Sequence, residues 1–488
     1  MAGRAPGYRR AMRAVWGDPA PLASAPWPDR CSTVVLGAGV TGLVTAALLA
    51  RAGRDVCVLE ARHVGAGTTG RSTGKVSLLQ GTTLSGLLSR HPEDVARRHL
   101  HANRAGQGWL SGFCAEQGVD LAVREAVTWA AGADEVDAAR AEHDAARVLG
   151  LPVRWSEDDD LPAPSWGSTR LAEQGQLDPV ALLDALARAV REAGGTIVEG
   201  ARVEHVSWSS PHLVRTTDGR ELRADDVVVA TGAPVVDRGG YFSRLTAQRS
   251  YALALGGTPG RELPMMLSAG DPGRSVRDAT DPAGRPVVLV GGYGHVVGRV
   301  ASEEAHLDQL RAWARGLFDG DEVAAWSAQD QGTPSGVPAV GRMPLGGGSV
   351  WVATGYDKWG FTNGTAAGLA VSDALLGVDE PRVHVDGPLD VSTAARWLAT
   401  NTRTGARMVS GAARAAAGRV SRALPCVGGV PDDAPPLCTH LGGTLSWNDA
   451  EQSWDCPLHG SRFAADGTVL DGPARRPLDV RTVTTGGN

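Results

Sequence analysis

The chain has 488 residues and carries a net charge of −6 with a pI near 6.1. This length exceeds what one hydrophobic core supports, so two or three domains are expected, and the acidic balance argues against a nucleic-acid partner. No segment approaches the run of about 20 apolar residues that a membrane span requires, and no signal peptide is recognisable. We therefore expect a cytoplasmic protein with no membrane span.

Lysine is almost absent from the chain. Of the 48 basic residues, only Lys75 and Lys358 are lysines, and both lie in glycine-rich stretches rather than on charged helical faces. Where arginine serves all general surface positions, a lysine offers a compact ammonium group with a movable pKa. We therefore single out Lys75 and Lys358 as candidate catalytic residues, against the alternative that they are chance remnants of a biased composition.

The first clear motif lies within residues 31–62, where two apolar runs flank a G-x-G-x-x-G sequence and a helix-forming segment. Gly37 permits a tight turn, Gly39 lets a pyrophosphate approach the backbone, and Gly42 lets the helix pack closely on the strand. The helix N-terminus offers unpaired N–H groups to phosphates. Glu60, which follows the second run, can accept hydrogen bonds from both ribose hydroxyls. The pattern predicts a Rossmann-like dinucleotide-binding unit.

The following elements alternate between two expected domains. Residues 62–77 are so rich in glycine and threonine that we expect a loop whose backbone wraps a ligand. A helix should begin at Pro179, with Asp178 as its cap, and end at Gly194. Further helices are expected over residues 91–118 and 134–149, and strands over 196–203, 206–214, 226–232, 249–255 and 287–295.

These motifs occur in the order found in the D-amino-acid oxidase/glycine oxidase family of FAD proteins, which the chain resembles over about residues 34–377. The opening fingerprint, the loop that ends at Lys75, the Leu-Asp-Pro helix start and the Val-Val-Val-Ala-Thr-Gly run that ends at Gly232 carry the resemblance. It implies FAD rather than NAD. It also implies that Glu60 holds the adenosine ribose and that Val203 lies by the adenine. The FAD contacts implied are Gly37, Gly39, Gly42, Glu60, Arg62, Thr69, Gly70, Arg71, Ser72, Val203, Gly232, Gly355, Trp359, Gly360, Phe361 and Thr362.

A helix is expected over residues 364–376, with Thr362 or Asn363 as its cap, so that its positive end points at the preceding loop. In the resembled family this loop lies at the pyrimidine edge of the flavin. Lys358, and Lys75 from the opposite loop, would add positive charge there and stabilise the reduced ring. The loop contains no cysteine, so we expect the FAD to be non-covalent.

The substrate domain of the resembled family roofs the flavin with an antiparallel sheet. Tyr251 and His295 lie on two expected strands of that sheet and are candidate catalytic residues, and Arg249 and Tyr293 are further candidate substrate contacts. Each of these side chains could equally be an ordinary strand residue.

Near the C-terminus, a C-x-H loop and a C-x-x-H loop supply Cys438, His440, Cys456 and His459. Four such groups can hold zinc, although zinc sites usually follow finger or ribbon spacing. A two-iron cluster takes the cysteine pair on one iron and the histidine pair on the other. The paired loops resemble a Rieske 2Fe-2S domain, and we assign the four residues as its metal ligands. The domain looks shortened before Cys438.

The expected fold class is α/β: a Rossmann-like FAD-binding domain with an interleaved α+β substrate domain, and a small all-β Rieske-like domain at the C-terminus. The expected limits are 1–30 for an irregular leader; 31–85, 175–235 and 325–390 for the FAD-binding domain; 86–174 and 236–324 for the substrate domain; 391–424 for a basic helical linker; and 425–488 for the Rieske-like domain.

The resemblance implies oxidation of a small amine or amino acid by FAD. The second redox centre suggests that electrons pass from reduced FAD to the 2Fe-2S cluster and on to an external one-electron acceptor, either a protein or a quinone. A dehydrogenase is favoured over an oxidase, because a built-in electron carrier is redundant if oxygen reacts directly. Two alternatives stay open: a flavin monooxygenase or reductase fed through the cluster, and a non-catalytic redox sensor whose C-terminal module binds zinc.

Overall fold

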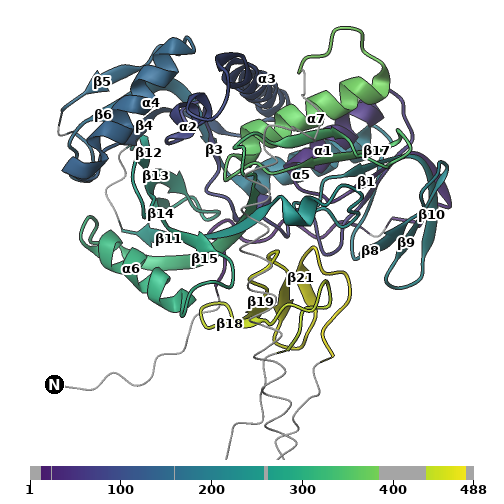
Figure 1. Cartoon of the computed structure of the whole chain (residues 1–488). Coiled ribbons are helices and arrows are strands. Elements are labelled where there is room, and N and C mark those ends of the chain that lie inside the picture. The colour runs from purple at the N-terminus through teal and green to yellow at the C-terminus, as the bar shows by residue number, and fades with distance from the viewer. Residues whose placement is uncertain (1–11, 24, 159, 258–261, 384–435, 480–488) are drawn as a thin grey trace, which may run out of the picture.

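The computed structural model describes residues 12–23, 25–158, 160–257, 262–383 and 436–479. Within these residues the strands form three sheets, of eight, nine and four strands. Figure 1 shows the four-stranded sheet, in yellow, below the region where the two larger sheets meet.

The eight-stranded sheet is built on the parallel strands that the apolar runs predict. Its strands are β1 (Arg30–Leu36), β2 (Val56–Leu59), β7 (Thr196–Val198), β8 (Val203–Val206), β9 (His212–Thr216), β10 (Glu221–Val229), β16 (Ala339–Arg342) and β17 (Val350–Thr354). β1 lies between β2 and β10, β17 follows β10, and all four run parallel. β2 and β17 are buried throughout, as are the last three residues of β1 and of β10, so these stretches are almost continuously apolar, whereas the first half of β10 alternates between exposed and buried residues.

Helices α1 (Val40–Arg51), α3 (Glu93–Gln117), α5 (Pro179–Glu192) and α7 (Gly360–Leu376) belong with this sheet. α1 packs against both α5 and α7, and α7 also packs against α3. The start of α5 confirms the expected cap, because Asp178 accepts a hydrogen bond from the Val180 amide at 2.7 Å.

The nine-stranded sheet is mostly antiparallel, as expected for the substrate domain. Its strand order is β15-β11-β14-β13-β12-β4-β6-β3, with β5 beside β6. The strands are β3 (Lys75–Val76), β4 (Leu121–Trp129), β5 (Arg154–Ser156), β6 (Ser168–Leu177), β11 (Thr246–Gly256), β12 (Met265–Ser268), β13 (Arg274–Thr280), β14 (Pro286–Val296) and β15 (Asp321–Gly332). The remaining helices of the described residues before the C-terminal module are α2 (Thr83–Leu88), α4 (Val136–Val148) and α6 (Glu303–Arg315). Three short helices lie among them: η1 (Thr69–Arg71), η2 (Ala133–Glu135) and η3 (Tyr241–Ser243).

The C-terminal module, residues 436–479, has four antiparallel strands of three residues each: β18 (Ser446–Asn448), β19 (Ser453–Asp455), β20 (Arg462–Ala464) and β21 (Val469–Asp471). Its hydrophobic core is correspondingly small and consists of Cys438, Leu445, Cys456, Leu458, Phe463, Val469, Ala474 and Leu478.

Three expected elements differ from the structure. The strand expected over 206–214 is interrupted, because residues 207–211 form the bend between the antiparallel strands β8 and β9. Helix α7 begins at Gly360, with Trp359 as its N-cap, so Thr362 and Asn363 lie inside the first turn. Their side chains are used elsewhere: Thr362 accepts a hydrogen bond from Gln80 at 2.9 Å and Asn363 accepts one from Asn103 at 2.8 Å. The expected strand over 196–203 is divided into β7 and β8, because the chain turns at Gly200, where φ is +64°.

The leader is described only in part, and the predicted linker is not described. Trp16 in the leader is buried and donates a hydrogen bond to the carbonyl of Ser72 at 2.9 Å. The predicted linker, residues 391–424, lies outside the described residues, and the domain limits stay predictions. None of the helices in the described ranges has both the length and the apolar character that a membrane crossing needs.

Candidate functional site

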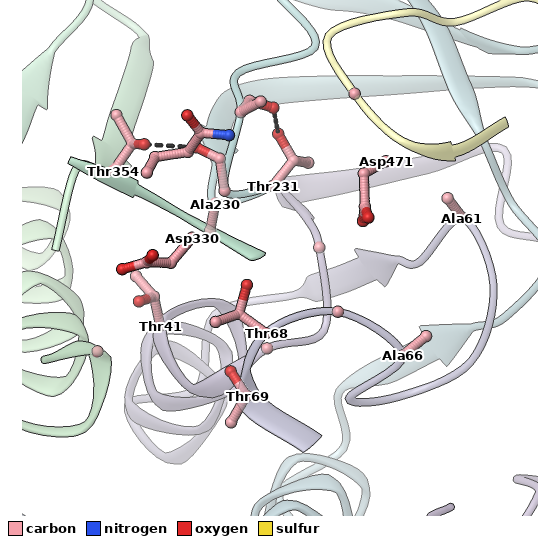
Figure 2. A pocket seen from close by; sticks show the side chains of 18 of the residues that line it. Thr41, Ala61, Ala66, Thr68, Thr69, Ala230, Thr231, Asp330, Thr354 and Asp471 are labelled. Carbon is pink, nitrogen blue, oxygen red and sulfur yellow. Dashed lines mark hydrogen bonds between the residues drawn. The ribbon is translucent and has the colours of Figure 1, made fainter. Parts of the chain in front are cut away.

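A cavity opens at the carboxyl ends of β1 and β2, where the glycine loop leads into α1 (Figure 2). Such a crevice is where dinucleotides bind in open α/β sheets. Most of the predicted FAD contacts line this cavity: Gly37, Gly39, Glu60, Arg62, Thr69, Ser72, Val203, Gly232, Gly355, Gly360 and Phe361.

The other predicted contacts lie behind this wall. A Cβ built on Gly42 would lie 2.0 Å from the Gly37 carbonyl oxygen, so Gly42 permits the close packing of α1 on the loop, as its spacing predicts. A Cβ on Gly70 would lie 2.4 Å from the Gly65 carbonyl oxygen. These two glycines therefore shape the wall without facing the cavity. Arg71, Trp359 and Thr362 are likewise not among the lining residues.

The Glu60 carboxylate stands directly after β2. Its Oε2 accepts a hydrogen bond from the Ala38 amide and its Oε1 accepts one from the Arg62 amide, both at 2.9 Å. These bonds fix the carboxylate, and each oxygen keeps a further lone pair for a hydroxyl group. Glu60 therefore fits the predicted role of holding a ribose.

The N-terminal end of α1 suits a pyrophosphate. Its first turn contains no acidic residue, and the partial positive charge of the helix end faces the cavity. Thr69 Oγ1 accepts a hydrogen bond from the Val40 amide at 3.2 Å and ties the Thr-Gly-Arg-Ser loop to this end. On the opposite wall, a Cβ added to Gly232 would meet nothing within 4 Å, so the backbone there is open to a ligand. The residues present fit FAD.

The structure separates the two lysines. Lys358 lines the cavity, and its backbone amide donates a hydrogen bond to the Asp330 carboxylate, which also lines it. Lys75 instead donates from Nζ to the Met266 carbonyl at 3.0 Å and is not among the lining residues. Burial, with a smaller contribution from Arg277, lowers the pKa of Lys75 to about 7. Of the two lysines, only Lys358 is among the lining residues, and the prediction that both add positive charge at the flavin ring stays a prediction.

Tyr251 and His295 face each other across β11 and β14 but do not line the cavity. The Tyr251 hydroxyl lies 2.8 Å from His295 Nε2, and burial lowers the pKa of His295 to about 4. Arg249, another candidate substrate contact, is fully buried and pairs with Glu451 and Asp455 of the C-terminal module. Its partner is thus the module rather than a substrate.

The two metal-binding loops of the module share one geometry. The Cys438 amide donates to the Gly443 carbonyl at 2.8 Å, and the Cys456 amide donates to the Ser461 carbonyl at 2.8 Å. A Cβ built on Gly443 would lie 2.6 Å from Leu458 Cδ1, so the two loops pack against each other at these positions. The five cysteines in the described ranges are free.

The four predicted ligands come together as two pairs. The Cys456 thiol donates a hydrogen bond to Cys438 and lowers the pKa of Cys438, which favours the thiolate that binds metal. The rings of His440 and His459 are 5.3 Å apart, and His440 Nδ1 is buried without a hydrogen-bond partner in the described structure. A cysteine pair and a histidine pair are the ligand set that a two-iron Rieske cluster takes.

Some lining residues were not predicted from the sequence. Gln329, Asp330 and Gln331 at the end of β15 line the cavity. Leu470 and Asp471 of the C-terminal module also line it, together with Gly472. No local sequence signal marks this second group, because it reaches the cavity only through the docking of the module.

Comparisons with known proteins agree with both parts of the site. The family model for FAD dependent oxidoreductases (DAO) matches residues 32–374, and the model for the Rieske [2Fe-2S] domain matches residues 434–483. YhfW of Bacillus subtilis (strain 168), named as a Rieske 2Fe-2S iron-sulfur protein, is 28% identical over 92% of both chains. A cytochrome b6-f complex iron-sulfur subunit of Nostoc sp. is 56% identical over 43 residues, which are 9% of this chain and 24% of that protein.

Solved structures show the same fold. Glycine oxidase from Geobacillus kaustophilus has a TM-score of 0.60 at 20% identity and covers 74% of this chain and 96% of its own. L-proline dehydrogenase from P. horikoshii has a TM-score of 0.58 at 19% identity and covers 72% and 94%. With the family model matched over most of the length, the resemblance inferred from the sequence is confirmed. The chain belongs to the DAO family of FAD-dependent oxidoreductases and carries a C-terminal Rieske domain, so its cofactors are FAD and a 2Fe-2S cluster.

Proposed function

We propose that the protein dehydrogenates a small amine or amino acid at its CH–NH bond and passes the electrons through the Rieske cluster to an external one-electron acceptor. The family assignment supports the flavin chemistry. The names of two structural neighbours, glycine oxidase and L-proline dehydrogenase, support an amino-acid substrate class. The electron relay is supported by a direct contact between a residue that lines the FAD cavity and a cluster-binding loop of the Rieske module.

The observation that carries the proposal is a hydrogen bond between the cavity wall and a cluster-binding loop. Gln329 Nε2 donates to the Gly460 carbonyl at 2.7 Å, and Gly460 directly follows the ligand His459. Gln329 Oε1 accepts from Arg249 Nη2 at 3.0 Å, so both ends of the amide are fixed. Gln329 also lines the cavity. One side chain therefore joins the FAD site to the cluster loop.

In the proposed reaction, the C–H bond next to nitrogen breaks, its hydrogen leaves with both electrons, and the N–H proton passes to water as the C=N bond forms. The imine then reacts with water to give a carbonyl compound and an amine or ammonia. Bound FAD supplies the two-electron acceptor, and the bound cluster supplies a one-electron path outward. The protein holds Lys358 at the cavity wall, where its backbone amide is bonded to Asp330.

Anaerobic stopped-flow mixing with the amine that reduces the protein tests this relay. In the wild-type protein we expect the flavin absorbance to bleach first and the cluster absorbance to follow. In Gln329→Leu we expect slower bleaching of the cluster relative to the flavin, because the hydrogen bond to Gly460 is lost.

Gln331→Leu is the matched control. Gln331 is two residues further along β15 and also lines the cavity, but its side chain makes no hydrogen bond to Gly460 among the described contacts. The ratio of the two bleaching rates should stay at the wild-type value in this variant. Bleaching of the flavin alone in the wild-type protein would rule out the relay. If the ratio of cluster bleaching to flavin bleaching were the same in Gln329→Leu and Gln331→Leu, Gln329 would not be the connection between the two centres.

Lys358→Met is expected to lower the reduction potential of the flavin and to slow its reduction by substrate. Lys358 is one of the residues that line the cavity, and a positive charge there stabilises the negative charge that a reduced flavin carries. The expected loss in rate is about 10²-fold, the lower end of the range for removing one preorganised donor. Lys358→Arg should recover part of it. Spectroelectrochemical titration and stopped-flow kinetics measure the two effects.

Lys75→Met provides the comparison, because this lysine is bonded to Met266 away from the lining residues. We expect a smaller shift in flavin potential than in Lys358→Met. An equal or larger shift in Lys75→Met would support the prediction that both lysines act on the flavin.

A further inference from the structure

The C-terminal module forms part of the wall of the FAD cavity. Leu470, Asp471 and Gly472, at the end of β21, line the same cavity as Glu60 and the glycine loop. Figure 2 shows the Asp471 side chain among the lining residues, on the side of Ala61. The FAD site of this chain is therefore not made by the FAD-binding part alone.

The Asp471 carboxylate is charged and held in place. Its Oδ1 lies 3.4 Å from Arg62 Nη2, and its Oδ2 lies 3.2 Å from Arg462 Nη1. Burial alone would raise the pKa of Asp471, but the positive charges of Arg62 and Arg462 outweigh it and lower the pKa. Each oxygen has one arginine partner, so each retains a lone pair for a further donor.

The chemistry of FAD indicates which half of the cofactor this carboxylate contacts. A carboxylate only accepts hydrogen bonds, so it does not suit the pyrophosphate, which offers no donor and repels it. Hydroxyl and N–H donors occur on both halves of FAD, so the position of Asp471 beside Arg62 selects the adenosine half. Arg62, the partner of Asp471, also donates its amide to Glu60, so the two carboxylates share one corner of the cavity. We propose that Asp471 is a ligand of the adenosine half of FAD and that the Rieske module completes the FAD site.

This contact also connects FAD to the cluster loop. Arg462 pairs with Asp471 at 3.2 Å and with Asp455 at 3.3 Å, and Asp455 directly precedes the cluster ligand Cys456. FAD binding and the folded state of the module are therefore linked, and by thermodynamic reciprocity each stabilises the other. The inference concerns FAD binding only, so it stands whether or not the proposed electron relay does.

The FAD dissociation constant of the full-length Asp471→Ala protein tests the proposal. Loss of one hydrogen bond to a charged group should weaken FAD binding by about ten- to a hundredfold. Fluorescence titration of the flavin-free protein measures the constant, and iron content and EPR check that the cluster is retained. Asp466→Ala is the matched control, because Asp466 lies in the exposed turn between β20 and β21 and does not line the cavity. A change below about threefold in Asp471→Ala with the cluster intact would overturn the proposal.

Hydrogen exchange on the wild-type protein keeps the proposal testable if Asp471→Ala loses its cluster. We expect the amides of residues 469–471 to exchange more slowly once FAD is added to flavin-free, cluster-containing protein. The amides of residues 465–468, in the neighbouring turn, should be unaffected. Equal exchange of residues 469–471 with and without FAD would show that the module does not take part in FAD binding.

Discussion

Cys456→Ala is expected to eliminate the iron–sulfur cluster and to unfold the C-terminal module. The module has strands of three residues and a core of eight side chains, two of which are the cysteine ligands. A core of this size supplies too little burial for independent stability, so domains of about 40 residues depend on metals or other cross-links. Metal binding energy is then folding energy. Iron and sulfide analysis, EPR and limited proteolysis within residues 436–479 measure the result.

Cys114→Ala is the control for this substitution. Cys114 is equally buried, but it lies in α3 and packs in the core of the FAD-binding part. Its loss should leave the iron content at the wild-type value and should not increase cleavage in the module. Wild-type iron content in Cys456→Ala would contradict the ligand assignment. One zinc ion per chain in the wild-type protein would contradict the two-iron cluster.

Local chemistry explains how much of the fold and site could be predicted. The glycine spacing around Gly37 and the carboxylate of Glu60 act within one β-α-β unit, so adjacent residues in the sequence set the geometry. The two metal loops are equally local, since hydrogen bonds within each loop fix the positions of Cys438 and Cys456. The Asp178 cap was predictable for the same reason, because the cap and its helix are consecutive.

Residues that act through docking could not be found in this way. Asp471 reaches the FAD cavity, and Gln329 reaches Gly460, only because the module packs against both larger sheets. Arg249 was a candidate substrate contact because it lies on a strand of the substrate domain. Its guanidinium group instead forms ion pairs with Glu451 and Asp455, which lie about 200 residues further along the chain. Neither the spacing of motifs nor the periodicity of apolar residues predicts contacts between segments that are this far apart in the sequence.

Arg249→Met is expected to destabilise the docked module. The Arg249 side chain is 0% exposed, its Nη2 lies 3.0 Å from Asp455 Oδ2, and it also pairs with Glu451. Removing one member of a buried charge group costs about 3–5 kcal/mol, because the remaining charges lose their compensation. Arg462 still pairs with both carboxylates, so we expect the lower part of this range. Urea unfolding monitored by the cluster absorbance measures the change in the free energy of unfolding.

Two comparisons separate lost charge pairing from lost packing. Arg285→Met removes an arginine that is 72% exposed beside Asp281 and should cost less than about 1 kcal/mol. In a double-mutant cycle, Arg249→Met and Glu451→Gln should be clearly non-additive, because the two residues are in contact.

The pH dependence of unfolding in acid gives an independent measure of the ion pair between Arg249 and Glu451 of the module. Burial alone would raise the pKa of Glu451, but Arg462 and Arg249 outweigh it and lower the pKa to about 2, from 4.5 for a free glutamate. Its contribution to stability is therefore complete above pH 4.5 and is lost as the pH falls toward 2. Arg249→Met should make this loss begin at a higher pH, because the folded pKa of Glu451 rises when one compensating charge is removed. Additive effects in the cycle, together with an unchanged acid transition, would show that Arg249 holds the module by packing alone.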